Sequence, residues 1–460
     1  MMDALSLARW QFGITTVYHF IFVPLTLGLS MLVAIMQSFY YRTGKDLYKE
    51  MTLFWVKLFV ILFTLGVVTG IVQEFQFGMN WSGYSRFVGD IFGIPLAIEA
   101  LTAFFVESTF LGLWLFGWTR LPKAVHLACI WLVVLASSLS SVWILLANAW
   151  MQVPVGYVLR NGRAELQDLV AILLNERALV QIPHTILAGF VTGGLFVLGI
   201  SAWNLLHKHR ADLFARSAQI ALVFTAVASL AVATTGHTQA QETVATQPMK
   251  LAAMEGLWET EGPASMSLFA LHDRENMSSI REFRMPYVLS ILAHNNLTGE
   301  VKGMKELQAE MEAAHGPGDY VPPVAIVYWS FRLMVGLGVF FILLSLRGLW
   351  NWWAGKLETR TGYLRVASLA LFLPFAANTA GWMVSELGRQ PWMVYGLLKT
   401  VDGVSPVVGP GTLWISMAGF TVIYGLLAAL GFSLVYKFAR PARAGEPPRT
   451  MAHLDGTHAY

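Results

Sequence analysis

The residues that could carry chemistry in this chain are ionisable and sulfur-containing side chains placed inside apolar segments. The stretch 378–392, NTAGWMVSELGRQPW, holds Glu386 where an apolar segment should leave a bilayer. A carboxylate at that depth is costly and is rarely left without a partner, so Glu386 is a candidate functional residue. The other candidates also lie in apolar segments, and they are His19, Glu99, Glu107, His184, Arg332 and Met334.

Histidine, methionine and carboxylate side chains at one depth of a helical bundle would suit a metal or haem site. His with Met is an axial pair for electron-transfer haem iron, whereas a single His or carboxylate leaves the opposite iron face open for oxygen. Ordinary alternatives stay open at this point. A membrane His can simply bond two helices together, and Met334 can be plain packing. Glu99 and Glu107 could each be half of a structural polar pair.

The composition indicates a polytopic membrane protein. Of 460 residues, 56% are hydrophobic and only 13% are charged, whereas a soluble protein carries roughly a quarter charged residues. The single cysteine, Cys129, excludes an internal disulfide and a cysteine-based metal or iron–sulfur site. The formal charge of +3 is too small to argue for a nucleic-acid partner.

The elements that must position these residues are long apolar helices. A helix needs about 20 mostly apolar residues to cross the hydrocarbon core. Nine segments qualify, and they are about 14–39, 53–77, 93–117, 125–149, 183–206, 217–237, 324–347, 365–386 and 412–437. The predicted fold is therefore all-α, a polytopic bundle of nine transmembrane helices.

The expected organisation has four parts. Residues 1–237 hold the first six spans, 238–323 form a long loop, 324–440 hold the last three spans, and 441–460 form a flexible cytoplasmic tail. Lys and Arg are more frequent in the short loops on one side, which predicts an N-terminus outside and a C-terminus in the cytoplasm. The N-terminus has no basic region before its first apolar segment, so we expect that segment to be retained.

This topology assigns a depth to each candidate. Five of them, from five different helices, should share one slab near the outer face, and these are His19, Glu99, His184, Met334 and Glu386, with Glu107 just below. Three other histidines, His126, His207 and His209, should lie at the inner face as interfacial or solvated residues.

Two further residues accompany the slab. Arg332 lies within a span, where an isolated cation is expensive. It would be satisfied by a haem propionate or by a salt bridge to Glu99 or Glu107. Trp382 precedes Glu386 by four residues, so both face the same way on a helix. It could be an aromatic ring between redox centres or an ordinary interface tryptophan.

Several segments together resemble subunit I of the cytochrome bd family of quinol oxidases, along essentially the full chain. The residues that carry the resemblance are WQFGITTVYHF with His19, the pair Glu99 and Glu107, QPMKLAAMEGLWE, WSFRLMVGLG (Trp329–Gly338) and GWMVSELGRQPW (Gly381–Trp392). The loop 238–323 is short, as in the short-loop subfamily.

The resemblance implies three haems. His184 and Met334 match the axial ligands of a low-spin haem b. His19 and Glu386 match the single ligands of two high-spin haems, one a haem b and the other a haem d or a further haem b. Which high-spin haem sits on which ligand stays open.

The resemblance also assigns the residues around the haems. Arg332 matches an arginine beside the low-spin haem, Trp382 a tryptophan among the haems, and Arg9 and Arg389 lie where propionate partners are expected. The remaining positions concern substrate and protons, and they are Glu99 and Glu107 at the oxygen-reducing end and Lys250 and Glu255 in the quinol-binding loop.

The implied activity is a terminal respiratory oxidase that oxidises quinol at the outer face and reduces O2 to water. Glu255 would take a quinol proton and Lys250 would donate a hydrogen bond, although both could be solvated loop charges instead. Glu107, with Ser108 and Ser140, is the expected last part of a proton path from the inner side. Lys57 could lie nearer the entrance of that path or simply snorkel. A proton gradient would then arise by charge separation without pumping.

The implied partners are subunit II, membrane lipid, O2 and either ubiquinol or menaquinol, in a bacterial or archaeal plasma membrane. A small single-span subunit is left open. One alternative is a cyanide-insensitive bd-type oxidase with only b haems. An alternative of a different class is a membrane transporter with buried ionisable residues, but the inverted repeats and broken helices usual in transporters are not visible.

Overall fold

The computed structural model describes residues 3–441 of the chain. Within that range eight helical segments are long and apolar enough to cross a membrane, and a bent helix pair makes a ninth. These segments are α1 (Ala4–Thr43), α2 (Asp46–Met79), the continuous run of α3 (Ser82–Ile98), η1 (Glu99–Phe104) and α4 (Phe105–Phe116), α5 (Lys123–Gln152), α7 (Glu176–Leu206), α8 (Ala211–Thr246), α12 (Val324–Trp353), the pair α13 (Thr361–Ala370) and α14 (Leu373–Leu387), and α16 (Pro410–Ala439). The predicted bundle is confirmed. The predicted tail, from residue 442 on, lies outside the described residues.

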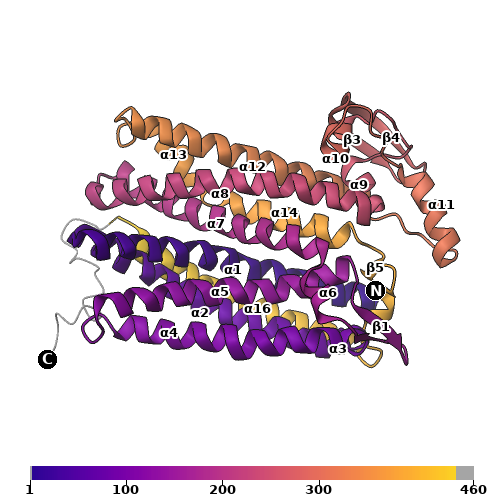
Figure 1. Ribbon diagram of the computed structural model, residues 1–460, viewed down its shortest axis with the longest axis horizontal. Helices are drawn as coiled ribbons and strands as arrows, with labels where there is room; N and C mark the ends of the chain where they lie inside the picture. The colour runs from indigo at the N-terminus through magenta and orange to yellow at the C-terminus, as the bar shows by residue number, and fades with distance from the viewer. Residues whose placement is uncertain (1–2, 442–460) are drawn as a thin grey trace.

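The helices run side by side as one bundle, and the segment between α8 and α12 gathers at one end, which we call the loop end (Figure 1). The N-terminus lies at the loop end, and α16 ends at the opposite end (Figure 1). The helix α8 continues to Thr246, beyond the predicted end of the sixth span at 237. Which end faces the cytoplasm stays a prediction.

The eighth span in chain order is broken in its middle. Helices α13 and α14 meet at an angle of 40° across a short break. Pro374 lies in the first turn of α14, where a proline is accepted because its missing N–H would have no partner there. The same ring cannot continue a helix from the preceding turn, so the chain bends before α14 and re-aims it toward the loop end.

The third span contains a π-helical turn, η1, which begins at Glu99. Such turns are rare and commonly accompany functional sites, since one inserted residue rotates the side chains that follow. Glu99 thus lies where the helix geometry changes, and Glu107 lies in the first turns of α4.

Close helix contacts hold the centre of the bundle together. A Cβ atom placed on Gly28 of α1 would meet Gly193 of α7 at 2.8 Å, and one on Gly193 would meet Gly28 at 2.5 Å. Small residues at such crossings let backbones approach closely, which is how membrane helices gain packing energy. The largest buried cluster lies on this crossing and extends over α2, α5 and α8, with Trp55 and Trp114 among its fully buried side chains.

The loop has a small core of its own and the longest of the three β-hairpins within residues 3–441. It contains α9 (Pro248–Glu255), the hairpin β3 (Met266–Asp273) and β4 (Ser278–Met285), α10 (Val288–His294) and α11 (Met304–His315). Trp258 and Met304 pack there against Val324 of α12 and Val384 of α14. Two smaller hairpins pair β1 (Tyr157–Arg160) with β2 (Arg163–Leu166) and β5 (Trp392–Val394) with β6 (Leu398–Lys399).

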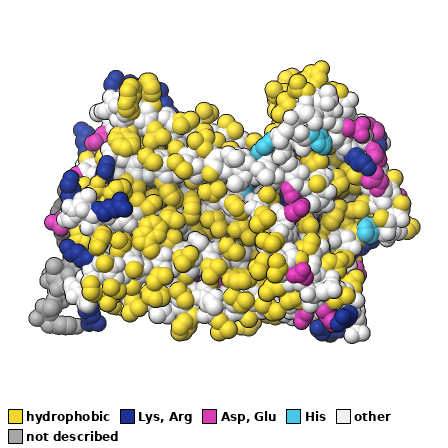
Figure 2. Space-filling view, in the orientation of Figure 1, with side chains coloured by type: hydrophobic (Ala, Val, Ile, Leu, Met, Phe, Trp, Pro, Cys, Tyr) yellow, Lys and Arg dark blue, Asp and Glu magenta, His cyan; other side chains and the backbone are white. Residues whose placement is uncertain are grey.

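The surface agrees with a membrane-spanning bundle. Figure 2 shows a broad apolar band across the helices, with Lys and Arg side chains gathered at the end opposite the loop. Residues in or next to the connections at that end include Arg42, Lys45, Arg120, Lys123 and Lys208. Acidic side chains are concentrated around the loop instead (Figure 2). Basic residues favour cytoplasmic loops, and the predicted orientation rests on this same charge pattern.

Candidate functional site

His19 is held from one side by a neighbouring helix. Its Nδ1 lies 2.8 Å from the hydroxyl of Thr69 on α2. That hydroxyl donates its own hydrogen to the carbonyl oxygen of Leu65, so it accepts from His19 Nδ1–H. Nε2 then carries the lone pair, which is the form of imidazole that binds a metal. Gly70 lets the ring approach, because a Cβ there would lie 3.1 Å from the ring.

His184 on α7 repeats this arrangement. Its Nδ1 lies 3.2 Å from the hydroxyl of Thr235 on α8, which donates to the carbonyl oxygen of Ala231. Gly236 follows, and a Cβ there would lie 3.1 Å from the imidazole. The dipeptide Thr-Gly therefore supports both predicted iron ligands. This support was not predicted, although both Thr-Gly pairs are visible in the sequence.

A glycine on a neighbouring helix also makes room for the side chain of Met334. On α12 its sulfur lies 3.0 Å from the position that a Cβ on Gly381 of α14 would take. Any larger residue at 381 would displace the sulfur. The thioether is thus half-buried between α12 and α14, and it lies against the backbone of Gly381.

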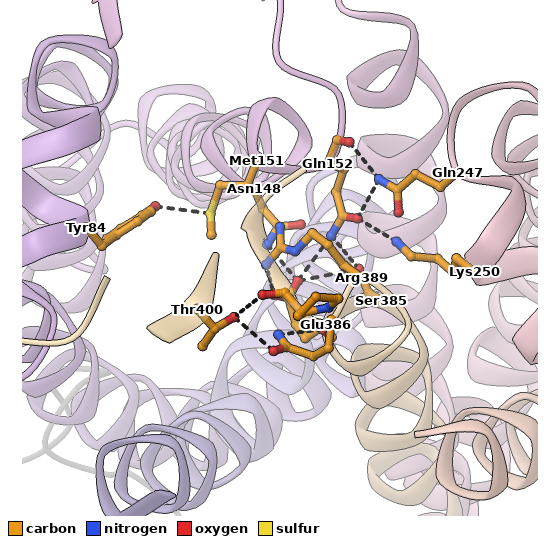
Figure 3. Close-up of polar contacts among 12 residues, drawn as sticks. Tyr84, Asn148, Met151, Gln152, Gln247, Lys250, Ser385, Glu386, Arg389 and Thr400 are labelled. Atoms are coloured by element: carbon orange, nitrogen blue, oxygen red, sulfur yellow. Dashed lines mark hydrogen bonds and ion pairs between the residues drawn. The ribbon is translucent and has the colours of Figure 1, made fainter. Parts of the chain in front are cut away.

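Glu386 lies at the centre of a polar network at the loop end (Figure 3). From α5, Asn148 Nδ2 donates to Glu386 Oε1 at 2.9 Å and Gln152 Nε2 donates to the same oxygen at 3.3 Å. Arg389 forms an ion pair with the other carboxylate oxygen, Oε2. The side chain of Glu386 nevertheless keeps 36% of its surface exposed, so a bound group can still reach it.

Arg389 fits an anionic group beside Glu386. Its side chain is only 2% exposed, yet Nε and Nη1 have no hydrogen-bond partner within residues 3–441. Buried polar groups are normally satisfied, so two free donors of one guanidinium predict a ligand with acceptor oxygens. A haem propionate has that chemistry. Arg9, the other predicted propionate partner, is exposed on α1.

Trp382 is on the same helix as Glu386, and its ring contacts α1, the helix that carries His19. Its ring centroid is 5.0 Å from that of Phe20, which in turn is 6.2 Å from the His19 ring. Trp382 and Glu386 share one helix face four residues apart. The aromatic side chains thus connect α1 with α14, which suits the predicted position among haems.

Glu99 and Glu107 each accept a hydrogen bond from one serine of α5. Ser140 donates to Glu99 at 2.5 Å, and Ser137 donates to Glu107, which is 7% exposed. The predicted grouping of Glu107 with Ser108 and Ser140 was wrong in its partners. Ser108 bonds a carbonyl of its own helix because Ser in a helix readily bonds back to residue i−4.

The loop residues Lys250 and Glu255 point to different neighbours, since they lie five positions apart on α9. Lys250 Nζ donates to Gln152 Oε1 at 2.5 Å, and Glu255 forms a 2.8 Å ion pair with Arg332. Both are 2% exposed, so the alternative of solvated loop charges is wrong. Burial raises the pKa of Glu255, against the lowering effect of Arg332. Burial also holds the pKa of Lys250 well below its usual range.

Arg332 contacts the loop rather than a carboxylate of the third span. It pairs with Glu255, donates to the carbonyl oxygens of Met254 and Ser267, and stacks on Tyr328 at 3.6 Å. The alternative of a salt bridge to Glu99 or Glu107 was therefore wrong, because α9 closes over α12 at the loop end. Arg332 ties α9 to the helix turn that carries Met334.

One buried ion pair was not predicted from the sequence. Arg177 and Glu242 lie 2.6 Å apart with side chains 4% and 8% exposed. Arg177 also donates to Gln181, whose amide donates to Asn148, so this pair extends the Glu386 network to α7 and α8. The signal was weak because both residues were assigned to loops, whereas the helices run past the predicted span ends.

His126 corrects another expectation. Instead of being solvated it is 4% exposed. Its Nε2 donates to the carbonyl oxygen of Trp114 at 2.8 Å, and Gln37 Nε2 donates to its Nδ1 at 2.7 Å. Both ring nitrogens are thus used in packing α5 against α1 and α4. His207 is exposed, as expected.

The candidate iron ligands are spread out rather than clustered. Within residues 3–441 no three His, Cys, Asp or Glu side chains are placed to hold a bare metal ion. One or two protein ligands per site are what a haem requires, because the macrocycle supplies the other four.

Comparison with known proteins gives concordant matches. The family model for cytochrome bd terminal oxidase subunit I matches residues 7–443. The chain is 51% identical to the cytochrome bd ubiquinol oxidase subunit 1 of Bacillus subtilis (strain 168), over 96% of this chain and 94% of that one. It is 40% identical to the cytochrome bd-II ubiquinol oxidase subunit 1 of Escherichia coli (strain K12), over 96% and 97% of the two chains.

A solved structure matches as well. The chain is similar to the bd oxidase from Geobacillus thermodenitrificans, with a TM-score of 0.86 and 27% sequence identity. The match covers 95% of this chain and 98% of that one.

Proposed function

This chain belongs to the cytochrome bd terminal oxidase subunit I family, and we propose from that premise that it is the haem-bearing subunit of a quinol:oxygen oxidoreductase. It oxidises quinol and reduces O2 to water. The observation that carries the proposal is the matched support of two imidazoles. Thr69 and Thr235 hold Nδ1 of His19 and His184, and both rings keep Nε2 for iron.

Three haems would be held by residues of this chain. His184 and Met334 would hold a low-spin haem b, while His19 and Glu386 would each hold one high-spin haem, one a haem b and the other a haem d or a further haem b. When bound, haem iron with two axial side chains transfers electrons, and haem iron with one leaves a position open for oxygen. Arg389 would bind a propionate with its two unpartnered nitrogens. Arg9, Arg332 and Trp382 would line the same haems.

The quinol site lies at α9. The Glu255 carboxylate accepts a proton from a quinol hydroxyl, and its raised pKa makes it a better base near neutral pH. Lys250 Nζ donates a hydrogen bond to a quinol oxygen, for which it must give up Gln152. Both side chains are buried, so the ring reaches them only as α9 or its covering residues move. The proposed functional divisions are the four predicted parts of the chain, namely the first six spans, the loop 238–323, the last three spans and the tail.

Protons for water would come from the end opposite the loop. Glu107 with Ser137 and Glu99 with Ser140 form two steps of hydroxyl and carboxylate along η1, α4 and α5. Lys57 lies toward the opposite end, where its ammonium is 3.8 Å from the Phe438 ring centroid. Because quinol protons leave at the loop end, turnover separates charge across the membrane without a pump.

The assembly and location follow from the same premise. Subunit II would cover part of the apolar surface, and α16 is the least buried of the eight unbroken spans within residues 3–441. A small single-span subunit and lipid would cover other parts. The protein would lie in a bacterial or archaeal plasma membrane with its loop end outside.

Oxygen uptake by the purified two-subunit protein tests the proposal. We expect quinol-dependent oxygen consumption, three haems per chain and a reduced spectrum with a chlorin band if haem d is present. A spectrum of b haems alone, with the activity intact, would identify the all-b form. A purified complex without haem would overturn the proposal.

A further inference from the structure

The side chain of Gln152 joins the quinol loop to Glu386. It is the last residue of α5 and is fully buried. On one side its Oε1 accepts hydrogen bonds from Lys250 Nζ at 2.5 Å and from Gln247 Nε2 at 3.0 Å. On the other side its Nε2 donates to Ser385 Oγ at 3.1 Å and to Glu386 Oε1 at 3.3 Å (Figure 3). One amide thus contacts both Lys250 of the proposed quinol site and Glu386, the proposed haem ligand.

The orientation of this amide is set by its neighbours. Lys250 and the Gln247 amino group are donors, and the Glu386 carboxylate is an acceptor. A flipped amide would face donors with its NH2 group and a carboxylate with its oxygen, which loses the bonds to Lys250, Gln247 and Glu386 and adds repulsion. Gln152 therefore has a direction, accepting from the loop and donating toward α14.

Hydrogen bonds accepted at an amide oxygen strengthen donation from its nitrogen, because successive bonds polarise one another in a low-dielectric interior. The Lys250 bond is the shorter of the two, so it contributes more of this polarisation than the Gln247 bond. Removing Lys250 from Gln152 weakens the Gln152–Glu386 bond.

The path of Lys250 supports this coupling. Its methylene stem crosses Gly388, where a Cβ would lie 2.8 Å from Lys250 Cγ. Gly388 follows Glu386 by two residues at the end of α14. Lys250 Nζ is therefore directed at Gln152 by the same turn of chain that ends the helix of Glu386.

We propose that Gln152 is a positioning residue that couples occupancy of the quinol loop to Glu386. The inference rests on the proposed function, since it needs a quinone ring at Lys250 and a haem at Glu386. An oxygen of the ring that takes the Lys250 N–H withdraws it from Gln152. Gln152 then donates a weaker hydrogen bond to Glu386. The carboxylate would therefore donate more electron density to the haem iron that it ligates.

Asn148 provides a matched control. It lies one turn before Gln152 on α5 and donates to the same oxygen, Glu386 Oε1. Its own Oδ1 accepts from Gln181 and has no bond to the loop. Replacing either amide removes one donor to Glu386, but only Gln152 also contacts Lys250.

The experiment measures absorption of the oxidised, purified two-subunit protein before and after adding oxidised decylubiquinone. The bands followed are those of the haem that Glu386→Ala removes. We expect a quinone-induced difference spectrum in the wild type and in Asn148→Leu, and its loss in Gln152→Leu. An unchanged difference spectrum in Gln152→Leu would overturn the inference.

Lys250→Met covers the case in which Gln152→Leu does not retain its haems. Its spectrum without quinone should already be displaced in the direction that quinone displaces the wild type. A spectrum identical to that of the quinone-free wild type would overturn the coupling.

Haem content and quinone binding, measured by equilibrium dialysis on the same samples, separate the two proposals. A wild type that holds its haems and binds quinone without any difference spectrum refutes the coupling and leaves the proposed function standing. A wild type that lacks haem, or that binds neither decylubiquinone nor a menaquinone, refutes both.

Discussion

The threonines behind the two histidines offer a test of the ligand geometry itself. Thr69→Val removes the hydroxyl that accepts from His19 Nδ1 and keeps the β-branched shape of the side chain. Thr235→Val does the same behind His184. Each change frees one imidazole to rotate or to change tautomer while leaving the other untouched.

The expected magnitude follows from the role of such supporting bonds. Removing a partner that orients a ligating histidine typically costs about 10–100-fold in affinity for the metal group. The Thr69 bond is 2.8 Å long and the Thr235 bond 3.2 Å, at the weak end of the range. His184 would also share its haem with Met334. We therefore expect Thr69→Val near the upper limit and Thr235→Val near the lower.

Haem transfer to excess apomyoglobin measures this difference, with the high-spin and low-spin bands followed separately. Thr69→Val should speed the loss of one high-spin haem, and Thr235→Val should affect only the low-spin haem. Equal loss of both haems in either variant, or no loss in both, would refute the assignment of Nε2 as the ligand atom.

Three further predictions concern protons and stability. Glu107→Ala should abolish oxygen reduction while quinol still reduces the low-spin haem in stopped-flow spectra, and normal turnover would exclude the relay role. The rate at which quinol reduces that haem should rise with pH, because Glu255 deprotonates through its raised pKa. Arg332→Gln removes a cation that lowers this pKa, so the rise in rate should move to higher pH. A shift to lower pH would contradict the assignment of Glu255 as the base. Arg177→Leu leaves the carboxylate of Glu242 buried and unpaired and should destabilise the protein by about 3–5 kcal/mol in thermal unfolding, whereas adding Glu242→Leu should recover most of the loss.

The spans were predictable because length and apolar composition alone identify membrane helices. Their ends were not, since α8 continues to Thr246 with polar residues that pack against the loop instead of water. The break before Pro374 was visible as a proline but its angle was not, because the neighbouring helices determine which way the chain turns.

The candidate ligands could be predicted as residues but not as a network. His19, His184, Met334 and Glu386 stand out because polar or sulfur side chains in apolar helices are few. Gln152 does not stand out, since a single glutamine near a helix end is common on any chain. Its importance comes from α5, α14 and the loop meeting around it, which are contacts between segments far apart in the sequence.

The pairing of charged groups was the least predictable part. Arg332 was expected to meet a carboxylate of the third span or a propionate, yet Glu255 reaches it from α9. Depth along a helix follows from topology, whereas the angular position that decides which neighbour is met depends on packing. The π-helical turn at Glu99 has the same effect, because it rotates Glu99 and Glu107 relative to an unbroken helix and directs them to different serines of α5.

The haem content of Glu386→Ala tests the central claim most directly. The purified variant should hold two haems per chain, with the spectrum of the low-spin haem at His184 and Met334 unchanged and one high-spin haem missing. A variant that retains all three haems would contradict the assignment of Glu386 as an iron ligand.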